Sequence, residues 1–192
     1  MIELVFLLEE ESAQAMLMSL LPRFLNPSIA VRYITFEGKQ DLDRQLTKKL
    51  KHYLNPQARF IVLRDQDSVP VCTVLKQALV DKCVEAGKQN VSMVRIACHE
   101  LETFYLADLA AVSQVFNLSL VKQQLNTKFR APDYLANPKQ ELQKLTRQAY
   151  QQISGSRDIA QYLDLENTRS TSFSHLIMAI RGMEQELIEF IN

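Results

Sequence analysis

Four short apolar segments, separated by longer segments of helical periodicity, constrain the fold of this chain most strongly. The longer segments repeat apolar residues at spacings of three and four, as amphipathic helices do. An alternation of strand and helix favours parallel strands joined by right-handed crossovers. We therefore expect an α/β fold with an open, mainly parallel four-stranded sheet and helices on both faces. The four predicted strands are residues 2–8, 29–36, 59–63 and 91–97.

The intervening helices are bounded by residues that commonly start or end helices. Ser12 can cap the helix that follows the first strand, and Pro22 should bend or stop that helix. Gly38 is expected to form the turn after the second strand, and Gly87 to cap the third helix at its carboxyl end. No flexible linker separates these elements.

The second half of the chain has no strand-like segment and is predicted to be helical. We expect an interruption near Asp108, and the hydroxyls of residues 170–172 can start the last helix. The chain then divides into an α/β core over residues 1–98 and an all-helical extension over residues 99–192 that packs on the core. The expected segments are a helix over 99–116, a loop over 126–139, and helices over 141–153, 158–163 and 173–191.

Composition and charge exclude several classes of protein. The chain has 22 basic and 22 acidic side chains, so non-specific coating of DNA is not expected, although a local basic groove is compatible with this balance. The apolar run over residues 4–8 is too short to span a bilayer and lacks the features of a signal peptide, which predicts a cytoplasmic protein without a membrane partner. Cys72, Cys83 and Cys98 lack paired spacing and are predicted to be buried thiols in a reducing compartment.

Acidic side chains follow three of the four predicted strands. Glu9 follows the first strand, Asp65 and Asp67 follow the third, and Glu100 and Glu102 follow the fourth. In open parallel sheets, ligands bind at the carboxyl ends of the strands. If the first and third strands are neighbours, their three carboxylates lie within reach of one cation. Because oxygen ligands favour hard cations, the sequence predicts a site for Mg²⁺ or Mn²⁺.

These acids also have an ordinary structural interpretation. Chains leave the core at strand ends, where charged residues are common, and Asp67 with Ser68 forms a standard start of a helix. Glu100 and Glu102 share a face in an extended segment but point apart on a helix, so only one is expected to reach the metal. Glu100 is preferred because it is nearer the strand end, and Glu102 would then orient another group.

Basic side chains expected near the same edge are candidates for holding a phosphate group. They are Lys39, Arg64, Arg95 and Arg169. Taken singly, each is more simply explained as a solvated surface charge. Nucleotide binding through a glycine-rich loop is not supported, because the chain has only four glycines and neither phosphate-binding glycine motif. Nucleophilic hydrolysis is not supported either, because no GxSxG turn is present.

Two sequence motifs resemble those of the TOPRIM domain, which topoisomerases, primases, recombination proteins and OLD-type nucleases share. They are FLLEEES at the end of the first strand and VLRDQD at the end of the third. The segments LLEEES, VLRDQDS, VRIACHELETFYLADL, KFRAPD and NTRSTSF resemble, over nearly the whole chain, a bacterial TOPRIM-like family of unknown function. Members of that family often lie beside an ABC-type ATPase in defence-associated operons.

The resemblance implies roles for individual residues. Glu9 matches the TOPRIM glutamate, and Asp65 and Asp67 match the pair of aspartates that binds Mg²⁺. Glu100 and Glu102 match the acidic ELE segment of the closer family. The fold implied is a TOPRIM-like, or Rossmann-like, α/β core.

Two hypotheses about function follow. The first is a Mg²⁺-dependent phosphoryl-transfer enzyme, a nuclease on DNA or RNA, in which Glu9, Asp65, Asp67 and Glu100 form the catalytic site and Glu9 is the general base if it is not a metal ligand. The second is a non-catalytic partner subunit of an ABC-type ATPase with a vestigial acidic site. One departure bears on the choice, since Glu10 stands where TOPRIM proteins commonly have glycine.

Overall fold

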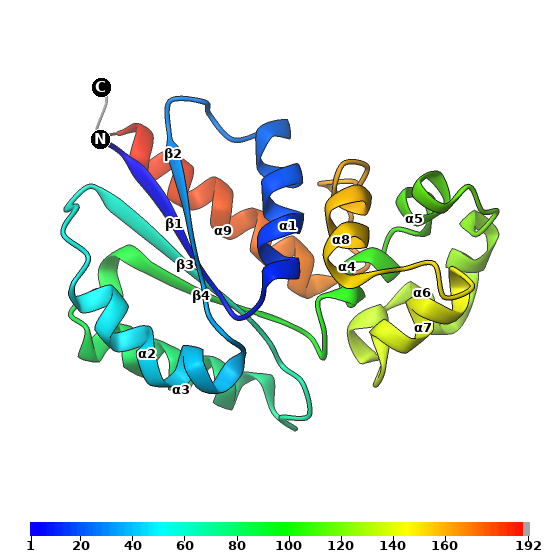
Figure 1. The fold of residues 1–192 in the computed structure, drawn as a ribbon, viewed down its shortest axis with the longest axis horizontal. Coiled ribbons are helices and arrows are strands. Elements are labelled where there is room, and N and C mark those ends of the chain that lie inside the picture. Colours follow the sequence, from blue (N-terminus) through cyan, green and yellow to red (C-terminus); the bar gives the residue numbers. More distant parts are fainter. Residues whose placement is uncertain (190–192) are drawn as a thin grey trace.

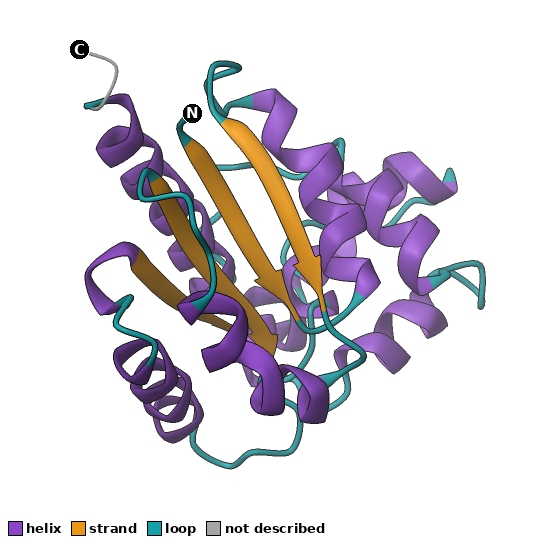
Figure 2. Cartoon of the chain, turned by 60° about the vertical axis from the view of Figure 1, so that its left-hand side comes forward, coloured by secondary structure: helices purple, strands orange, loops and turns teal. Residues whose placement is uncertain are grey.

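The computed structural model describes residues 1–189 of the chain, which contain one four-stranded sheet. All neighbouring strands are parallel, and their order is β2-β1-β3-β4. Figure 2 shows the four strands running side by side in one direction. This confirms the α/β fold and the expectation that the first and third strands are neighbours. The strands are β1 (Glu3–Leu8), β2 (Ala30–Thr35), β3 (Ala58–Asp65) and β4 (Ser92–Ala97).

The strand β1 pairs with β2 on one edge and with β3 on the other, and its side chains are buried on both faces of the sheet. Leu4, Phe6 and Leu8 pack into one core, whereas Val5 and Leu7 pack into a second core on the opposite face. Side chains alternate between the two faces of a strand, so an uninterrupted apolar run fills both cores. The sheet therefore requires a layer of helices on each side.

Two pairs of helices provide these layers. Helices α2 (Lys39–Lys51) and α3 (Cys72–Glu85) cover the Val5 face, and α1 (Glu11–Leu20) and α9 (Thr171–Ile188) cover the Leu4 face. Helix α9 comes from the far end of the chain and lies along the sheet, against β1, β3 and β4 (Figure 1). The last helix is thus part of the α/β layers, and the name helical extension is kept below for residues 99–170.

Helices α4 to α8 lie beyond the carboxyl ends of the strands (Figure 1). Helix α8 packs along α1, which joins this helical extension to the sheet layers. No helix among the described residues is both long enough and apolar enough to cross a membrane. The α-helices of the extension are α4 (Glu102–Leu106), α5 (Leu109–Phe116), α6 (Thr127–Arg130), α7 (Pro138–Leu145) and α8 (Gln152–Ala160). The 3₁₀ helices are η1 (Leu21–Arg23), η2 (Gln89–Val91), η3 (Val121–Leu125) and η4 (Pro132–Tyr134).

The prediction of one helix over residues 141–153 is wrong. Helix α7 ends at Leu145, and the chain then turns at Arg147 and Gln148, whose φ angles of 52° and 68° are incompatible with a right-handed helix. The next helix, α8, therefore starts at Gln152.

Other predicted boundaries in this half also shift. The segment predicted as a helix over 158–163 is the end of α8 and the turn after it, and the predicted loop over 126–139 contains α6 and η4. The last helix starts at Thr171 rather than at residue 173, and its predicted end at residue 191 lies outside the described residues.

Most of the predicted helix ends are confirmed. Helix α1 stops just before Pro22, Gly87 has a left-handed φ of 68° after α3, and the side chain of Asp108 caps α5 by accepting from the Ala111 amide. The prediction for Ser12 is wrong, because α1 starts at Glu11 and Ser12 lies inside its first turn.

The cysteines are all free thiols, and they differ in burial. Cys83 is buried, with 2% of its surface exposed, as predicted. Cys72 and Cys98 are only partly buried, which corrects the expectation of three buried thiols. Both line a cavity beside the edge strand β4.

The cap of α9 provides a test of the fold. The buried Ser170 hydroxyl accepts from the Phe173 amide (3.1 Å) and donates to Oδ1 of Asp133 (2.7 Å). We expect Ser170→Ala to lower the free energy of unfolding in urea by about 1–2 kcal/mol, because it removes a cap and leaves Asp133 short of a donor. Ser154→Ala, at an exposed position of α8, is the control and should change the value by less than about 0.5 kcal/mol. Equal effects of the two substitutions would contradict this account of the cap.

Candidate functional site

Carboxylates that follow three of the four strands lie close together at the carboxyl end of the sheet. The pairing of β1 with β3 sets Leu8 opposite Leu63, so Glu9 lies beside the end of β3. The Asp65 amide donates to Oε2 of Glu9 (3.2 Å). Asp65 in turn is close enough to Glu9, Glu10 and Glu102 to be repelled by each of them. The structure thus brings acids from β1, β3 and the start of α4 into one cluster.

Asp65 is the centre of this cluster. Burial raises the pKa of its carboxyl well above the ordinary value, and repulsion from Glu10, Glu102 and Glu9 raises it further. The Leu101 amide donates to Oδ2 of Asp65 (3.2 Å) and partly opposes this shift. Burial and the three neighbouring acids therefore both oppose ionisation of the Asp65 carboxyl.

Glu102, rather than Glu100, joins Asp65. Glu102 is the first residue of α4 and only 1% exposed, and its Oε1 accepts from the Tyr150 hydroxyl (2.9 Å). Burial raises the pKa of Glu102 to about 7, with smaller contributions from Glu10 and Glu100. The sequence analysis preferred Glu100 as the residue that reaches the metal, but Glu100 does not join Asp65, because the chain turns sharply at His99 before α4 begins.

Glu9 is the second acid with a shifted pKa near neutrality. Burial raises the pKa of Glu9 to about 7, and repulsion from Asp67 adds to the shift. Arg64 acts in the opposite direction, with its Nε 3.7 Å from Oε2 of Glu9. The guanidinium of Arg64 is shared, because its Nη1 donates to Oδ1 of Asp43 (2.6 Å).

Glu10 is a site residue that the sequence analysis did not assign to the metal. Both of its carboxylate oxygens accept from Nε2 of Gln152 (3.0 and 3.3 Å), and it also accepts from the Ser12 hydroxyl. Its carboxylate is near enough to Asp65 to raise the pKa of that group. The sequence did contain a signal for Glu10, because it stands in the FLLEEES motif at the position where TOPRIM proteins commonly have glycine.

Asp67 and Glu100 lie in a cleft of about 500 Å³ next to the cluster. Nζ of Lys39, which also lines the cleft, lies 3.0 Å from Oδ2 of Asp67. Glu100 accepts from the Lys139 amide (2.8 Å) at the start of α7. The predicted set of acids is therefore divided between a buried cluster and an open cleft.

The backbone at the mouth of the cleft is strained. Asp67 and His99 have φ angles of 53° and 59°, in the left-handed region that most residues avoid. The Asp67 amide donates to the His99 carbonyl (2.7 Å), so each turn supports the other. Strain of this kind persists where the surroundings fix it, and it commonly occurs at functional sites.

Two of the predicted phosphate-binding residues lie elsewhere. Nε of Arg95 donates to the His175 carbonyl (2.9 Å) on α9, and Nη1 of Arg169 donates to the Ala107 carbonyl (3.3 Å). Within residues 1–189, neither forms an ion pair with an acid of the cluster or the cleft. Lys39 and Arg64 are therefore the predicted cations that contact the site acids.

The donor atoms of the cluster are chemically suited to a hard divalent cation. They are carboxylate oxygens, together with the buried hydroxyl of Tyr105, which lies near Ser156, Asp65, Glu10 and Glu102. Nevertheless, no group of three acids, histidines or cysteines in the described residues is already arranged to hold a metal ion. Internal donors occupy the acids instead, and a cation would have to replace some of them.

Tyr150 packs closely enough to require a glycine in α8. A Cβ atom on Gly155 would lie 2.5 Å from Cδ2 and Cε2 of the Tyr150 ring. We expect Gly155→Ala to lower the free energy of unfolding by about 1–3 kcal/mol, because the ring and its bond to Glu102 must move. Gly182→Ala is the matched control, since no atom lies within 4 Å of that Cβ in α9, and it should raise stability by up to about 1 kcal/mol. Equal changes in the free energy of unfolding in urea for the two variants would contradict the close packing of Tyr150 on Gly155.

The raised pKa values predict how stability depends on pH. A folded protein that binds protons more tightly than the unfolded chain loses stability as the pH rises. For Glu9 and Glu102 the loss should begin near the ordinary pKa of 4.5 and be complete above the folded value of about 7. In EDTA, the free energy of unfolding should therefore fall across this range, and less steeply in Glu102→Gln. Stability that rises with pH, or an unchanged slope in the variant, would contradict the shifts.

A family model described as a domain of unknown function (DUF4276) matches residues 8–181. The match therefore includes every acid of the cluster and the cleft. No curated protein and no solved structure matches the chain. These comparisons assign no activity to the chain.

Proposed function

The chain belongs to the family described as a domain of unknown function (DUF4276), and we propose that it is a Mg²⁺-dependent phosphoryl-transfer enzyme of the cytoplasm, a nuclease on DNA or RNA. One observation carries the proposal: Glu9, Glu10, Asp65 and Glu102 converge at the carboxyl ends of the strands and repel one another. Desolvated acids in mutual repulsion are stabilised by a divalent cation, and this end of a parallel sheet is where ligands bind.

Each acid has a part in the proposed site. Asp65, Glu10 and Glu102 would hold Mg²⁺ or Mn²⁺ once the ion displaces some of their internal donors, with Asp67 at the side of the cleft. The bound ion neutralises charge on the phosphate and lowers the pKa of a water molecule. Glu9 is near enough to Asp67 for the two carboxylates to repel each other, and it could accept a proton from the attacking water.

The cleft supplies the place for the phosphate group. The ammonium of Lys39 is half-exposed and paired with Asp67, so it can exchange this partner for a phosphate oxygen. The Glu100 carboxylate stays bound to the start of α7 and shapes the opposite wall. A substrate bound in the cleft would thus place its phosphate group beside Asp67 and Lys39.

A second function is favoured by the internal ion pairs. Lys39 and Arg64 already contribute positive charge to Asp67 and Glu9, which reduces the need for a cation. In this alternative, the protein is a non-catalytic partner of an ABC-type ATPase, and the acids only stabilise the strand ends. Metal binding and metal-dependent cleavage separate the two functions.

Asp65→Asn tests the proposed function directly. We expect calorimetry to detect Mn²⁺ binding by the wild type and at least tenfold weaker binding by this variant, because it loses the central ligand. In EDTA the variant should be as stable as the wild type or more so, since it removes a repelled charge. Asp81→Asn, at an exposed position of α3, is the control and should bind Mn²⁺ as the wild type does.

Cleavage assays with DNA and RNA complete the test. We expect Mg²⁺-dependent cleavage by the wild type and by Asp81→Asn, and none by Asp65→Asn. Retained metal-dependent cleavage in Asp65→Asn would refute the assignment of that residue. Absence of both Mn²⁺ binding and cleavage in the wild type would favour the non-catalytic partner.

A further inference from the structure

A cavity in the helical extension carries three cationic side chains. It has a volume of about 440 Å³ and lies between α5, η3 and the segment before α9. Lys122, Arg130 and Arg169 contribute the charges, and Val121 and Leu125 contribute apolar walls. None of these residues belongs to the acidic cluster or to the cleft beside it.

The positive charge of this cavity exceeds the charge of the single acid in its wall. Lys122, Arg130 and Arg169 form no ion pair within residues 1–189. The carboxylate in the wall, Asp108, is 7% exposed and already accepts from the amides of Ala111 (3.2 Å) and Asp164 (2.8 Å). In a chain of zero net charge, such a cluster of unpaired cations favours an anionic ligand.

The two guanidinium groups are held in place by the backbone. Nε of Arg130 donates to the Leu125 carbonyl (2.8 Å), and Nη1 of Arg169 donates to the Ala107 carbonyl (3.3 Å). Each arginine has five N–H donors, so most remain available to a ligand. A guanidinium with two free donors can bind a phosphate group in a bidentate manner.

The walls of the cavity indicate what the anion is attached to. The side chains of Val121 and Leu125 are 57% and 71% exposed. Exposed apolar groups beside cations suit a ligand that joins a phosphate to a flat, weakly polar group, as a nucleotide does. A bare inorganic anion would leave this apolar surface in water.

We propose that this cavity binds the phosphate backbone of a single-stranded nucleic acid, with a sugar or base packed on Leu125 and Val121. The inference rests on the proposed nuclease function for the identity of the polymer and adds a contact outside the cleft. The helical extension lies beyond the carboxyl ends of the strands, so a bound strand runs at the same end of the sheet as the acids (Figure 1).

Binding of a fluorescein-labelled single-stranded DNA, measured by anisotropy in EDTA, tests the proposal without cleavage. The double variant Lys122→Gln/Arg130→Gln should bind at least tenfold more weakly than the wild type. The slope of log affinity against log salt should fall by about 1.4, since each lost phosphate contact on a single strand contributes about 0.7. Both residues are exposed, so the variant should fold normally.

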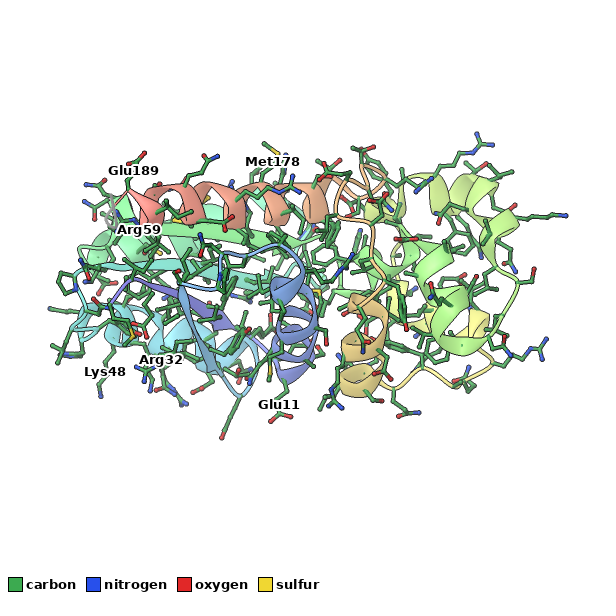
Figure 3. The ribbon with its side chains drawn as sticks, turned by 90° about the horizontal axis from the view of Figure 1, so that it is seen from above. Glu11, Arg32, Lys48, Arg59, Met178 and Glu189 are labelled. Atoms are coloured by element: carbon green, nitrogen blue, oxygen red, sulfur yellow. The ribbon has the colours of Figure 1, made fainter. Side chains whose placement is uncertain are left out.

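Lys48→Gln/Lys49→Gln is the matched control. These two lysines are exposed on α2, and Figure 3 shows Lys48 at the opposite end of the molecule from the helical extension. We expect this control to change the affinity less than twofold. Equal losses in the two double variants would show diffuse electrostatic attraction and overturn the cavity site, as would no loss or no binding by the wild type.

A competition experiment identifies the chemistry that the cavity recognises. Inorganic polyphosphate should displace the labelled DNA at a lower concentration than polyglutamate does, when both concentrations are expressed per negative charge. Equal or better displacement by polyglutamate would overturn the phosphate site in favour of an acidic protein partner. Failure of the proposed function is distinguishable, because it shows as lost Mn²⁺ binding and cleavage, whereas this test depends only on binding in EDTA.

Discussion

The pairing of β1 with both β2 and β3 is the constraint on which the rest of the structure depends. Pairing on both edges places β1 inside the sheet, and its apolar side chains point to both faces, so each face requires a helical layer. The same register places Leu8 opposite Leu63, so that Glu9 emerges at the end of β3, where its carboxylate accepts from the Asp65 amide. The two cores and the acidic cluster therefore have one common cause.

The helical extension determines how those acids are held. Tyr150 donates to Glu102, Gln152 donates to Glu10, and the start of α7 donates to Glu100. These donors belong to residues 139–152, whereas Glu10 belongs to the α/β core and Glu100 and Glu102 directly follow the last strand. The candidate site is thus built jointly by the sheet and the extension, and Gly155 contributes by allowing Tyr150 to approach α8.

The site contains several features that each lower stability. Asp65, Glu9 and Glu102 have raised pKa values because of burial and mutual repulsion, and Asp67 and His99 adopt left-handed backbone conformations. Sequences usually agree with their fold at every level, and exceptions concentrate at functional sites. Their presence at one end of the sheet supports a function that needs concentrated negative charge there.

The sequence alone determined the strands, the layers and the first carboxylates, because apolar periodicity and strand ends are local properties of the chain. Apolar runs marked β1 and β3, and Glu9 and Asp65 follow from where those runs stop. Tertiary structure decided what depends on distant contacts. The choice of Glu102 over Glu100 was set by the turn at His99, which the β3–β4 ends hold in place.

The tertiary structure also placed residues that no local pattern could place. Arg95 and Arg169 contact backbone carbonyls away from the acids, and Glu10 faces the cluster because Gln152 binds it across the interface of α1 and α8. Local spacing cannot encode these contacts, because each depends on which elements pack together once the two cores have formed.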